Sequence, residues 1–200
     1  MPHDDPSPET LERLERAEQL KLQGKYREAL AMLEELLLED PENVSALEEV
    51  ADNELSLGDF RRAETAAQQA IALDTASYTG HYILGFLRSR TEQWTEAVTH
   101  LRKANQLKSN NAEILRCLGW ALFHAGQRAQ GIVTLERALN LDSISALTLC
   151  DLGVAYLEVQ NIVKSRTLLE RALEIEPGNV RARECLTAVE RVSKAEVKQG

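Results

Sequence analysis

Three ladders of small residues, each with a period of 34 positions, constrain the fold of this chain more than any other feature. The first contains Ala29, Ala63, Ala97, Gly131 and Ser165; the second contains Ala17, Ala51, Gly85, Gly119 and Gly153 and ends at Thr187; the third contains Ala70, Ala104, Ala138 and Ala172, with Leu36 at its beginning. A fixed period of this length, kept without an insertion, indicates stacked supersecondary units. Because helices approach closely only where side chains are short, the same helix crossing is predicted in every unit.

The stretch 114–142 shows what one unit contains. It reads as two amphipathic helices joined at Gly126, with large residues such as Leu118 and Leu135 filling the space around the small ones. Applied to the whole chain, the pattern predicts helix pairs at about 9–23 and 26–38, 44–57 and 60–73, 78–90 and 94–107, 112–125 and 128–141, and 146–159 and 162–175.

These units resemble the tetratricopeptide (TPR) repeat, which has 34 residues and a helix–turn–helix form. The matching residues are Leu118-Gly119, Leu122, Gly126, Leu135, Ala138 and Leu141-Asp142 in the fourth unit; Leu152-Gly153, Tyr156, Ala172 and Glu176-Pro177 in the fifth; and Gly24-Lys25-Tyr26, Ala29-Leu30 and Asp40-Pro41 in the first. The resemblance implies an all-α fold, a right-handed superhelical solenoid of antiparallel helix pairs. Glu92 and Gln160 stand where other units have the turn glycine, which leaves the local turn geometry open there.

The period also predicts the domain organisation. Residues 1–8 are expected to be a disordered tail and 194–200 a frayed one. Between them, residues 9–193 are expected to form a single TPR array with units 10–43, 44–77, 78–111, 112–145 and 146–179 and a closing helix at 180–193. Ser7 is expected to cap the first helix, and Asn43 and Asn111 to cap later ones. The polar side of the closing helix is expected to shield the end of the stack.

Charge and hydropathy exclude several classes of partner. The net charge is −9, with 19 acidic and 7 basic side chains before Tyr78 and 13 acidic and 16 basic from there on. The chain lacks the basic stripe of a nucleic-acid-binding protein. It has no run of 18 apolar residues, so no membrane span is expected. The uneven charge suggests steering of a partner or head-to-tail contact between copies, with a solvated acidic surface as the alternative.

The first ten residues, MPHDDPSPET, do not read as a secretory signal, because no basic region is followed by an apolar run. A cytoplasmic location is therefore expected. Cys117, Cys150 and Cys185 lie in first helices or in the closing helix. A metal or redox site is one interpretation, but no Cys-x-x-Cys or Cys–His spacing is present, so packing residues in a reducing compartment are favoured.

No catalytic or cofactor-binding motif is recognisable. The chain has no Gly-rich phosphate loop, no His-Glu-x-x-His and no Gly-x-Ser-x-Gly, and its four histidines lack spaced partners. We therefore expect neither an enzyme nor a bound cofactor or metal.

The resemblance to TPR proteins also implies which residues bind a partner. In that family the first helix of each pair lines the concave groove through the second, fifth, ninth, twelfth and thirteenth positions of the unit. From these positions the expected peptide-binding residues are Glu48, Asp52, Tyr82, Phe86, Arg90, Arg116, Trp120, Phe123, His124, Val154 and Leu157. The aromatic members would form a run on the inner wall, and aromatic and Arg side chains are typical of binding hot spots. The alternative is that the rings pack against a neighbouring helix; it stays open for Phe123 above all.

The groove positions also indicate the chemistry of the ligand. The carboxylate clamp of some TPR domains is missing, because Leu14, Glu18, Thr79 and Ile83 occupy its positions. Glu48, Glu49 and Asp52 make the early end of the groove acidic. The expected function is a non-catalytic adaptor that binds a protein or peptide with an apolar segment and a basic end. A self-assembling scaffold, a secretion-type chaperone for an apolar client segment, and a structural component of a larger assembly are the alternatives.

Overall fold

The computed structural model describes residues 7–197; the expected tails at 1–6 and 198–200 lie outside this range. In the described part every regular element is an α-helix, which confirms the all-α fold. The contacts divide the chain into two compact units, with the boundary in the sequence between Thr91 and Glu92. The first unit contains α1 (Pro8–Leu22), α2 (Tyr26–Glu39), α3 (Val44–Leu57), α4 (Phe60–Leu73) and α5 (Tyr78–Arg90). The second contains α6 (Trp94–Leu107), α7 (Ala112–His124), α8 (Arg128–Leu141), α9 (Ala146–Glu158), α10 (Ile162–Ile175) and α11 (Val180–Val197).

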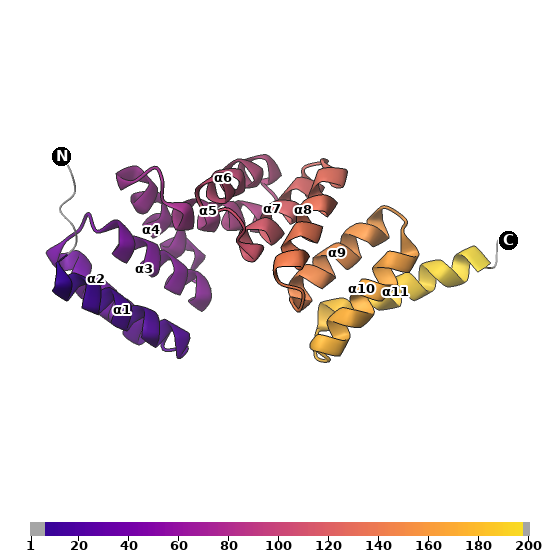
Figure 1. Cartoon of the computed structure of the whole chain (residues 1–200), viewed down its shortest axis with the longest axis horizontal. Coiled ribbons are helices and arrows are strands. Elements are labelled where there is room, and N and C mark those ends of the chain that lie inside the picture. The colour runs from indigo at the N-terminus through magenta and orange to yellow at the C-terminus, as the bar shows by residue number, and fades with distance from the viewer. Residues whose placement is uncertain (1–6, 198–200) are drawn as a thin grey trace. The chain divides into compact units, whose positions relative to one another are not determined.

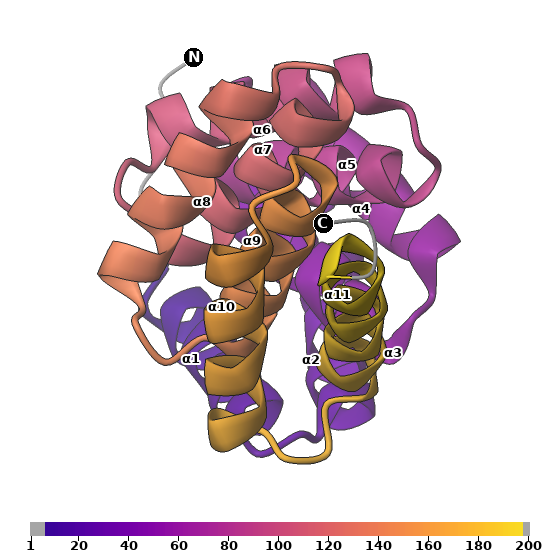
Figure 2. The ribbon, with the colours of Figure 1, turned by 90° about the vertical axis from the view of Figure 1, so that its right-hand side faces the viewer.

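Successive helices within each unit form antiparallel pairs joined by short turns (Figure 1). The first ten helices begin and end within one residue of the expected positions, and α11 continues to Val197, beyond the expected end at 193. Figure 2 shows α10 and α11 connected by the turn that contains Pro177 and Gly178. That the two units form one continuous array over residues 9–193 stays a prediction.

Polar caps recur with the repeat and fix where the first helices begin. The side chain of Ser7 accepts a hydrogen bond from the backbone N–H of Thr10, and Pro8 opens α1, where the missing N–H is not needed. The same capping bond is made before each later first helix and before α11 by Asn43, Ser77, Asn111, Ser145 and Asn179. A hydroxyl or amide oxygen at this position satisfies one of the free N–H groups of the first turn.

The turns inside the helix pairs keep one backbone conformation even where glycine is replaced. Gly24, Gly58 and Gly126 have positive φ angles of 74°, 81° and 86°. Glu92 and Gln160, which take the glycine positions of the third and fifth pairs, keep φ angles of 59° and 61°. The repeat geometry thus imposes a left-handed residue at a cost that glycine would not incur.

The small-residue ladders mark the helix crossings. A Cβ atom built on Gly119 of α7 would lie 2.8 Å from the backbone nitrogen of Leu135 and 2.9 Å from the carbonyl oxygen of Gly131, both on α8. One repeat later, Ser165 donates a hydrogen bond of 2.7 Å to the carbonyl of Gly153, so its hydroxyl is satisfied at the crossing. At these crossings a side chain larger than the one present would overlap the neighbouring helix.

Each unit has its own apolar core. Leu33, Ala51 and Ile83 are fully buried in the first unit, and Leu135 and Leu169 in the second. No helix of the described residues is both long enough and apolar enough to cross a membrane.

The cysteines lie within the packing of the second unit. Cys117 and Cys150 are buried and Cys185 is half-buried, and all three are free thiols. Burial raises the pKa of the Cys150 thiol to about 11 and raises the pKa of Cys117 further. A neutral buried thiol is a poor nucleophile, so Cys117 and Cys150 are best explained as packing residues.

Candidate functional site: the inner walls of the two units

The expected groove residues divide between the two units, and each set is described by itself. The first-unit wall consists of Glu48, Asp52, Tyr82, Phe86 and Arg90. The second-unit wall consists of the expected residues Arg116, Trp120, His124, Val154 and Leu157, to which the structure adds Arg181. The expected aromatic run draws two rings from each unit, so its continuity stays a prediction.

A buried carboxylate organises the second-unit wall. Asp151 of α9 is buried and accepts one hydrogen bond of 2.8 Å from Arg116 of α7 and another of 2.6 Å from Arg181 of α11. Arg116 also binds Glu113 on its own helix. A buried carboxylate is tolerated when it is paired and hydrogen-bonded in this way. Asp151 therefore connects three helices and fixes the position of both guanidinium groups.

Arg181 also packs on Trp120. Its guanidinium carbon lies 4.8 Å from the centroid of the Trp120 ring, within the range of a cation–π interaction. The Arg181 side chain is 44% exposed and Trp120 is half-buried. Asp151 thus holds the Arg181 guanidinium over the indole while both side chains stay partly open to solvent.

His124 lies in an aromatic cluster beside this pair. Its ring stacks on Trp94 of α6 with centroids 4.7 Å apart and meets Trp120 edge to face at 4.2 Å. The Nε2 atom of His124 is buried without a hydrogen-bond partner within the described residues. Burial lowers the pKa of His124, and the nearby positive charge of Arg181 lowers it further. The negative charges of Glu158, Asp151 and Glu92 raise this pKa by smaller amounts. The neutral imidazole is therefore favoured.

Phe123 does not contribute to an open wall. It is 1% exposed and packs with Leu135 and Leu152 in the core of the second unit. This is the alternative that the sequence left open for it. Val154 and Leu157 remain half-buried, on the second-unit wall with Trp120.

The acidic part of the first-unit wall is partly neutralised. Lys21 of α1 donates to Glu49 at 2.8 Å and to Asp52 at 2.9 Å. Glu48 accepts a hydrogen bond of 2.5 Å from Ser77, and burial raises the pKa of Glu48 despite this bond. With the three carboxylates of Glu48, Glu49 and Asp52 against the two cations Lys21 and Arg90, the wall keeps a net negative charge when all five are ionised.

The other residues of the first-unit wall are held by their own unit. The rings of Tyr82 and Phe86 lie 6.4 Å apart, half-buried against the core of the first unit. Arg90 was expected to face the groove; its guanidinium lies 4.1 Å from the ring centroid of Phe60, at the start of α4.

Four contributors were missed from the sequence: Arg181, Asp151, Trp94 and Lys21. A signal for Arg181 existed, because it lies two repeat periods after Glu113 and so at a groove position of a sixth first helix. Residues 180–193 were expected only to close the stack, so no groove position was assigned to them. Lys21 falls at the twelfth position of the first unit, which is also a groove position of the family. Asp151 and Trp94 do not occupy groove positions, and only the packing of three helices shows their role.

Comparison with known proteins supports the repeat assignment. A tetratricopeptide repeat family model matches residues 14–74 and 49–112. Anaphase-promoting complex subunit 3 of Schizosaccharomyces pombe is 22% identical over 126 residues, which are 63% of this chain and 19% of that protein. The chain thus spans about a fifth of the curated relative that it matches.

Solved structures share the fold at low sequence identity. The thermophilic TPR protein TTC0263 of Thermus thermophilus has a TM-score of 0.67 at 22% identity, covering 90% of this chain and 97% of that chain. YrrB, a TPR protein with an unusual peptide-binding site, has a TM-score of 0.64 at 21% identity, covering 86% and 89%.

The Cut9–Hcn1 hetero-tetramer of the APC/C has a TM-score of 0.81 at 18% identity, covering 88% of this chain and 35% of that one. The 34-residue ladders, the helix pairs crossing at small residues, the family model and these likenesses agree. The chain belongs to the tetratricopeptide repeat family.

Proposed function

We propose that the protein is a non-catalytic interaction module that binds a polypeptide segment on its inner walls. The observation that carries this proposal is the partly exposed pair of Arg181 and Trp120, in which the guanidinium carbon lies 4.8 Å from the ring centroid and the buried Asp151 holds Arg181. Trp and Arg are the side chains most enriched at binding hot spots. Because Asp151 and Trp120 position Arg181 in advance, little side-chain entropy is left to lose on binding.

The two walls favour different parts of a partner. In the second unit, Trp120, Val154 and Leu157 offer apolar surface, which favours an aliphatic or aromatic segment. In the first unit, the acidic side chains Glu48, Glu49 and Asp52 outnumber the basic side chains Lys21 and Arg90, which favours basic residues in the partner. We propose that the partner carries both kinds of segment. The likeness to YrrB, a TPR protein with a peptide-binding site, supports a ligand of this kind.

A selection of 12-residue peptides displayed on phage, made against the full chain, tests the proposal. The recovered peptides are expected to contain aliphatic residues together with Lys or Arg. In titrations with those peptides, Trp120→Ala and Arg181→Ala are each expected to weaken affinity by about 30-fold, the size of a hot-spot effect.

Arg137→Ala is the matched control for Arg181→Ala, because Arg137 is an exposed arginine of α8 outside both walls. Its affinity is expected to equal that of the unchanged protein. The proposal would be refuted if Trp120→Ala and Arg181→Ala, like Arg137→Ala, bound every recovered peptide as tightly as the unchanged protein.

Self-assembly is a second candidate, favoured by the distribution of charge. The acidic excess lies in the residues before Tyr78, whereas basic side chains outnumber acidic ones from there on. The acidic part of one copy therefore attracts the basic part of another, and salt weakens this attraction. Sedimentation velocity at low and high salt measures it. A monomer at every protein and salt concentration would exclude it.

A further inference from the structure

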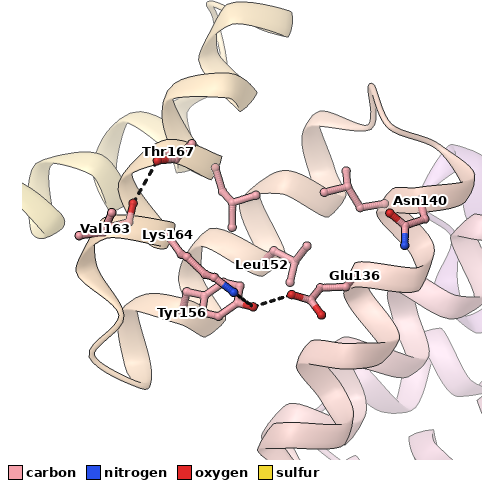
Figure 3. A pocket seen from close by; sticks show the side chains of 9 residues that line it. Glu136, Asn140, Leu152, Tyr156, Val163, Lys164 and Thr167 are labelled. Carbon is pink, nitrogen blue, oxygen red and sulfur yellow. Dashed lines mark hydrogen bonds between the residues drawn. The ribbon is translucent and has the colours of Figure 1, made fainter.

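A pocket of about 460 Å³ lies between α8, α9 and α10, within the second unit (Figure 3). Its apolar lining comes from Leu139, Leu152 and Leu168, and its polar lining includes Glu136, Tyr156 and Lys164. This volume lies within the range of pockets that bind small ligands or single side chains. The mixture of an apolar lining with a few fixed polar groups is also typical of binding pockets.

The pocket is separate from the second-unit wall. Leu152 and Tyr156 are four residues apart on α9, so they share one face of the helix. Val154 lies midway between them in the sequence and therefore on a different face, where the wall is formed. None of the residues assigned to the wall lines the pocket.

A tyrosine hydroxyl links two opposite charges at this pocket. Tyr156, which is 8% exposed, donates a hydrogen bond of 2.6 Å to Oε1 of Glu136 and accepts one of 3.1 Å from Nζ of Lys164. Figure 3 shows both charged side chains reaching toward this hydroxyl. The hydroxyl uses one carboxylate oxygen and one of three ammonium N–H groups, so both ions keep capacity for further hydrogen bonds.

The corresponding position in the first unit, three repeat periods earlier, has a different arrangement. There Glu34, Glu54 and Arg62 replace Glu136, Tyr156 and Lys164. Arg62 forms ion pairs with both glutamates directly, at 2.7 Å from Glu54. The charges of that site pair directly, whereas in the second unit the Tyr156 hydroxyl bridges Glu136 and Lys164.

The pattern of charges indicates the ligand. An extended peptide residue presents its N–H and its C=O on the same edge, as the hydrogen-bonded pairs of a β-ladder show. A carboxylate and an ammonium group side by side complement that edge, one accepting and the other donating. The charges of Glu136 and Lys164 cancel, so the site favours a neutral dipole over a strongly charged ligand. Exposed Val163 (77%) and Val133 (55%) add apolar surface on α10 and α8.

We propose that this pocket binds an extended peptide segment, with one aliphatic side chain against the half-buried Leu139 and Leu168, above the fully buried Leu152, and the N–H and C=O of the same residue on Glu136 and Lys164. It is a second binding site, formed mainly by second helices, and it does not depend on the inner walls.

The minimal probe is N-acetyl-leucine methylamide, which carries one aliphatic side chain flanked by the required N–H and C=O. Methyl NMR of the full chain follows its binding. We expect saturable shifts of the Leu139, Leu152 and Leu168 methyl groups, with a Kd on the order of 1 mM for so small a ligand. N-acetyl-glycine methylamide lacks the side chain, and the probe methylated on the leucine nitrogen lacks the donor. Both are expected to bind at least about fivefold more weakly.

Protein variants separate the site from others. Lys164→Ala and Val163→Arg are expected to weaken the probe at least about fivefold, because the first removes the donor and the second obstructs the rim. The matched control is Leu38→Arg, because Leu38 lies on α2 of the first unit and is 84% exposed. This variant is expected to leave the Kd of the probe unchanged. Trp120→Ala is also expected to leave the probe's Kd unchanged, which distinguishes this site from the second-unit wall.

Any of four results would overturn the proposal. The first is the absence of shifts at the three leucines up to the solubility limit of the probe, and the second is equal binding of the parent and N-methylated probes. The third is binding of the probe by Lys164→Ala and Val163→Arg as tightly as by the unchanged protein. The fourth is binding of free leucine at the same methyl groups in preference to the capped probe, which would indicate an amino-acid site.

Discussion

At the scale of single residues, the small positions have the most direct energetic role. Gly119 faces backbone atoms of α8, and atoms of the main chain move aside only if the whole helix shifts. Gly178 has no neighbour within 4 Å of a built Cβ, although it is also a glycine of the second unit. The contrast between these two glycines gives a matched test of the crossing.

Gly119→Ala is expected to destabilise the protein by about 1–3 kcal/mol, because the added methyl group overpacks the crossing of α7 and α8. Gly178→Ala is expected to change the unfolding free energy by less than about 0.5 kcal/mol. Urea unfolding followed by circular dichroism measures both. A Gly119→Ala protein as stable as its Gly178→Ala counterpart would show that the crossing is not tightly packed.

His124 makes stability depend on pH. Burial lowers the pKa of His124 in the folded state below its ordinary value, so the unfolded chain binds the proton more tightly. The contribution of His124 is therefore fully present at pH values above its unfolded pKa and is lost as pH falls below about 6.5. The charged groups that act on it are Glu158, Asp151, Arg181 and Glu92.

The comparison of His124→Phe with the unchanged protein isolates this effect between pH 5.5 and 7.5. The unchanged protein is expected to lose more stability toward the acidic end than the variant. The raised pKa of Glu48 acts in the opposite direction in both proteins and so cancels in the difference. Parallel curves of unfolding free energy against pH would contradict the burial of a neutral His124.

At the scale of elements, the turn of the fifth helix pair shows how the repeat overrides local preference. Gln160 keeps a φ angle of 61° because α9 and α10 must meet at the same angle as the other pairs. A side chain in the left-handed region is strained, and glycine is not.

Gln160→Gly is therefore expected to raise the unfolding free energy by about 0.5–1 kcal/mol. The control is Gln130→Gly within α8, which is expected to lower it by about 1 kcal/mol. A loss of stability in Gln160→Gly would contradict the account of this turn.

The elements also show what the sequence predicts well and what it does not. The helix ends followed from the 34-residue period, because caps such as Asn43 and Asn111 and glycines such as Gly126 recur in register. The charged contacts of the walls did not follow. Arg181 reaches Trp120 and Asp151 only because α11 packs beside α9, and residues thirty or sixty positions apart in sequence carry no local sign of that contact.

Burial explains why Phe123, unlike Trp120, does not lie on the wall as its groove position predicted. The groove positions of the family place Phe123 and Trp120 alike on the wall, but Phe123 is enclosed by the core whereas Trp120 stays half-buried. Two residues three apart on a helix share a face only approximately, and the neighbouring helices decide which one is covered.

At the scale of the whole molecule, stability in a repeat protein is a sum over neighbouring helices. Helix α11 covers Leu149, Cys150 and Leu169 through Ala182 and Val189. Removal of residues 180–200 is therefore expected to lower amide protection in α9 and α10 first and to leave α1 to α4 unchanged. Hydrogen exchange measured by mass spectrometry resolves these segments. A uniform loss of protection along the chain would show a single cooperative unit instead.

The central claim is that the inner wall of a TPR stack, organised around Trp120 and Arg181, binds a polypeptide. Its most direct test is an NMR titration of the full chain with a phage-selected peptide, following the indole N–H of Trp120 and the side-chain N–H groups of Arg181. We predict saturable shifts of both signals and none at Tyr26, which lies at the start of α2 and outside both walls. Saturable binding that leaves Trp120 and Arg181 unshifted would place the ligand elsewhere and contradict the account.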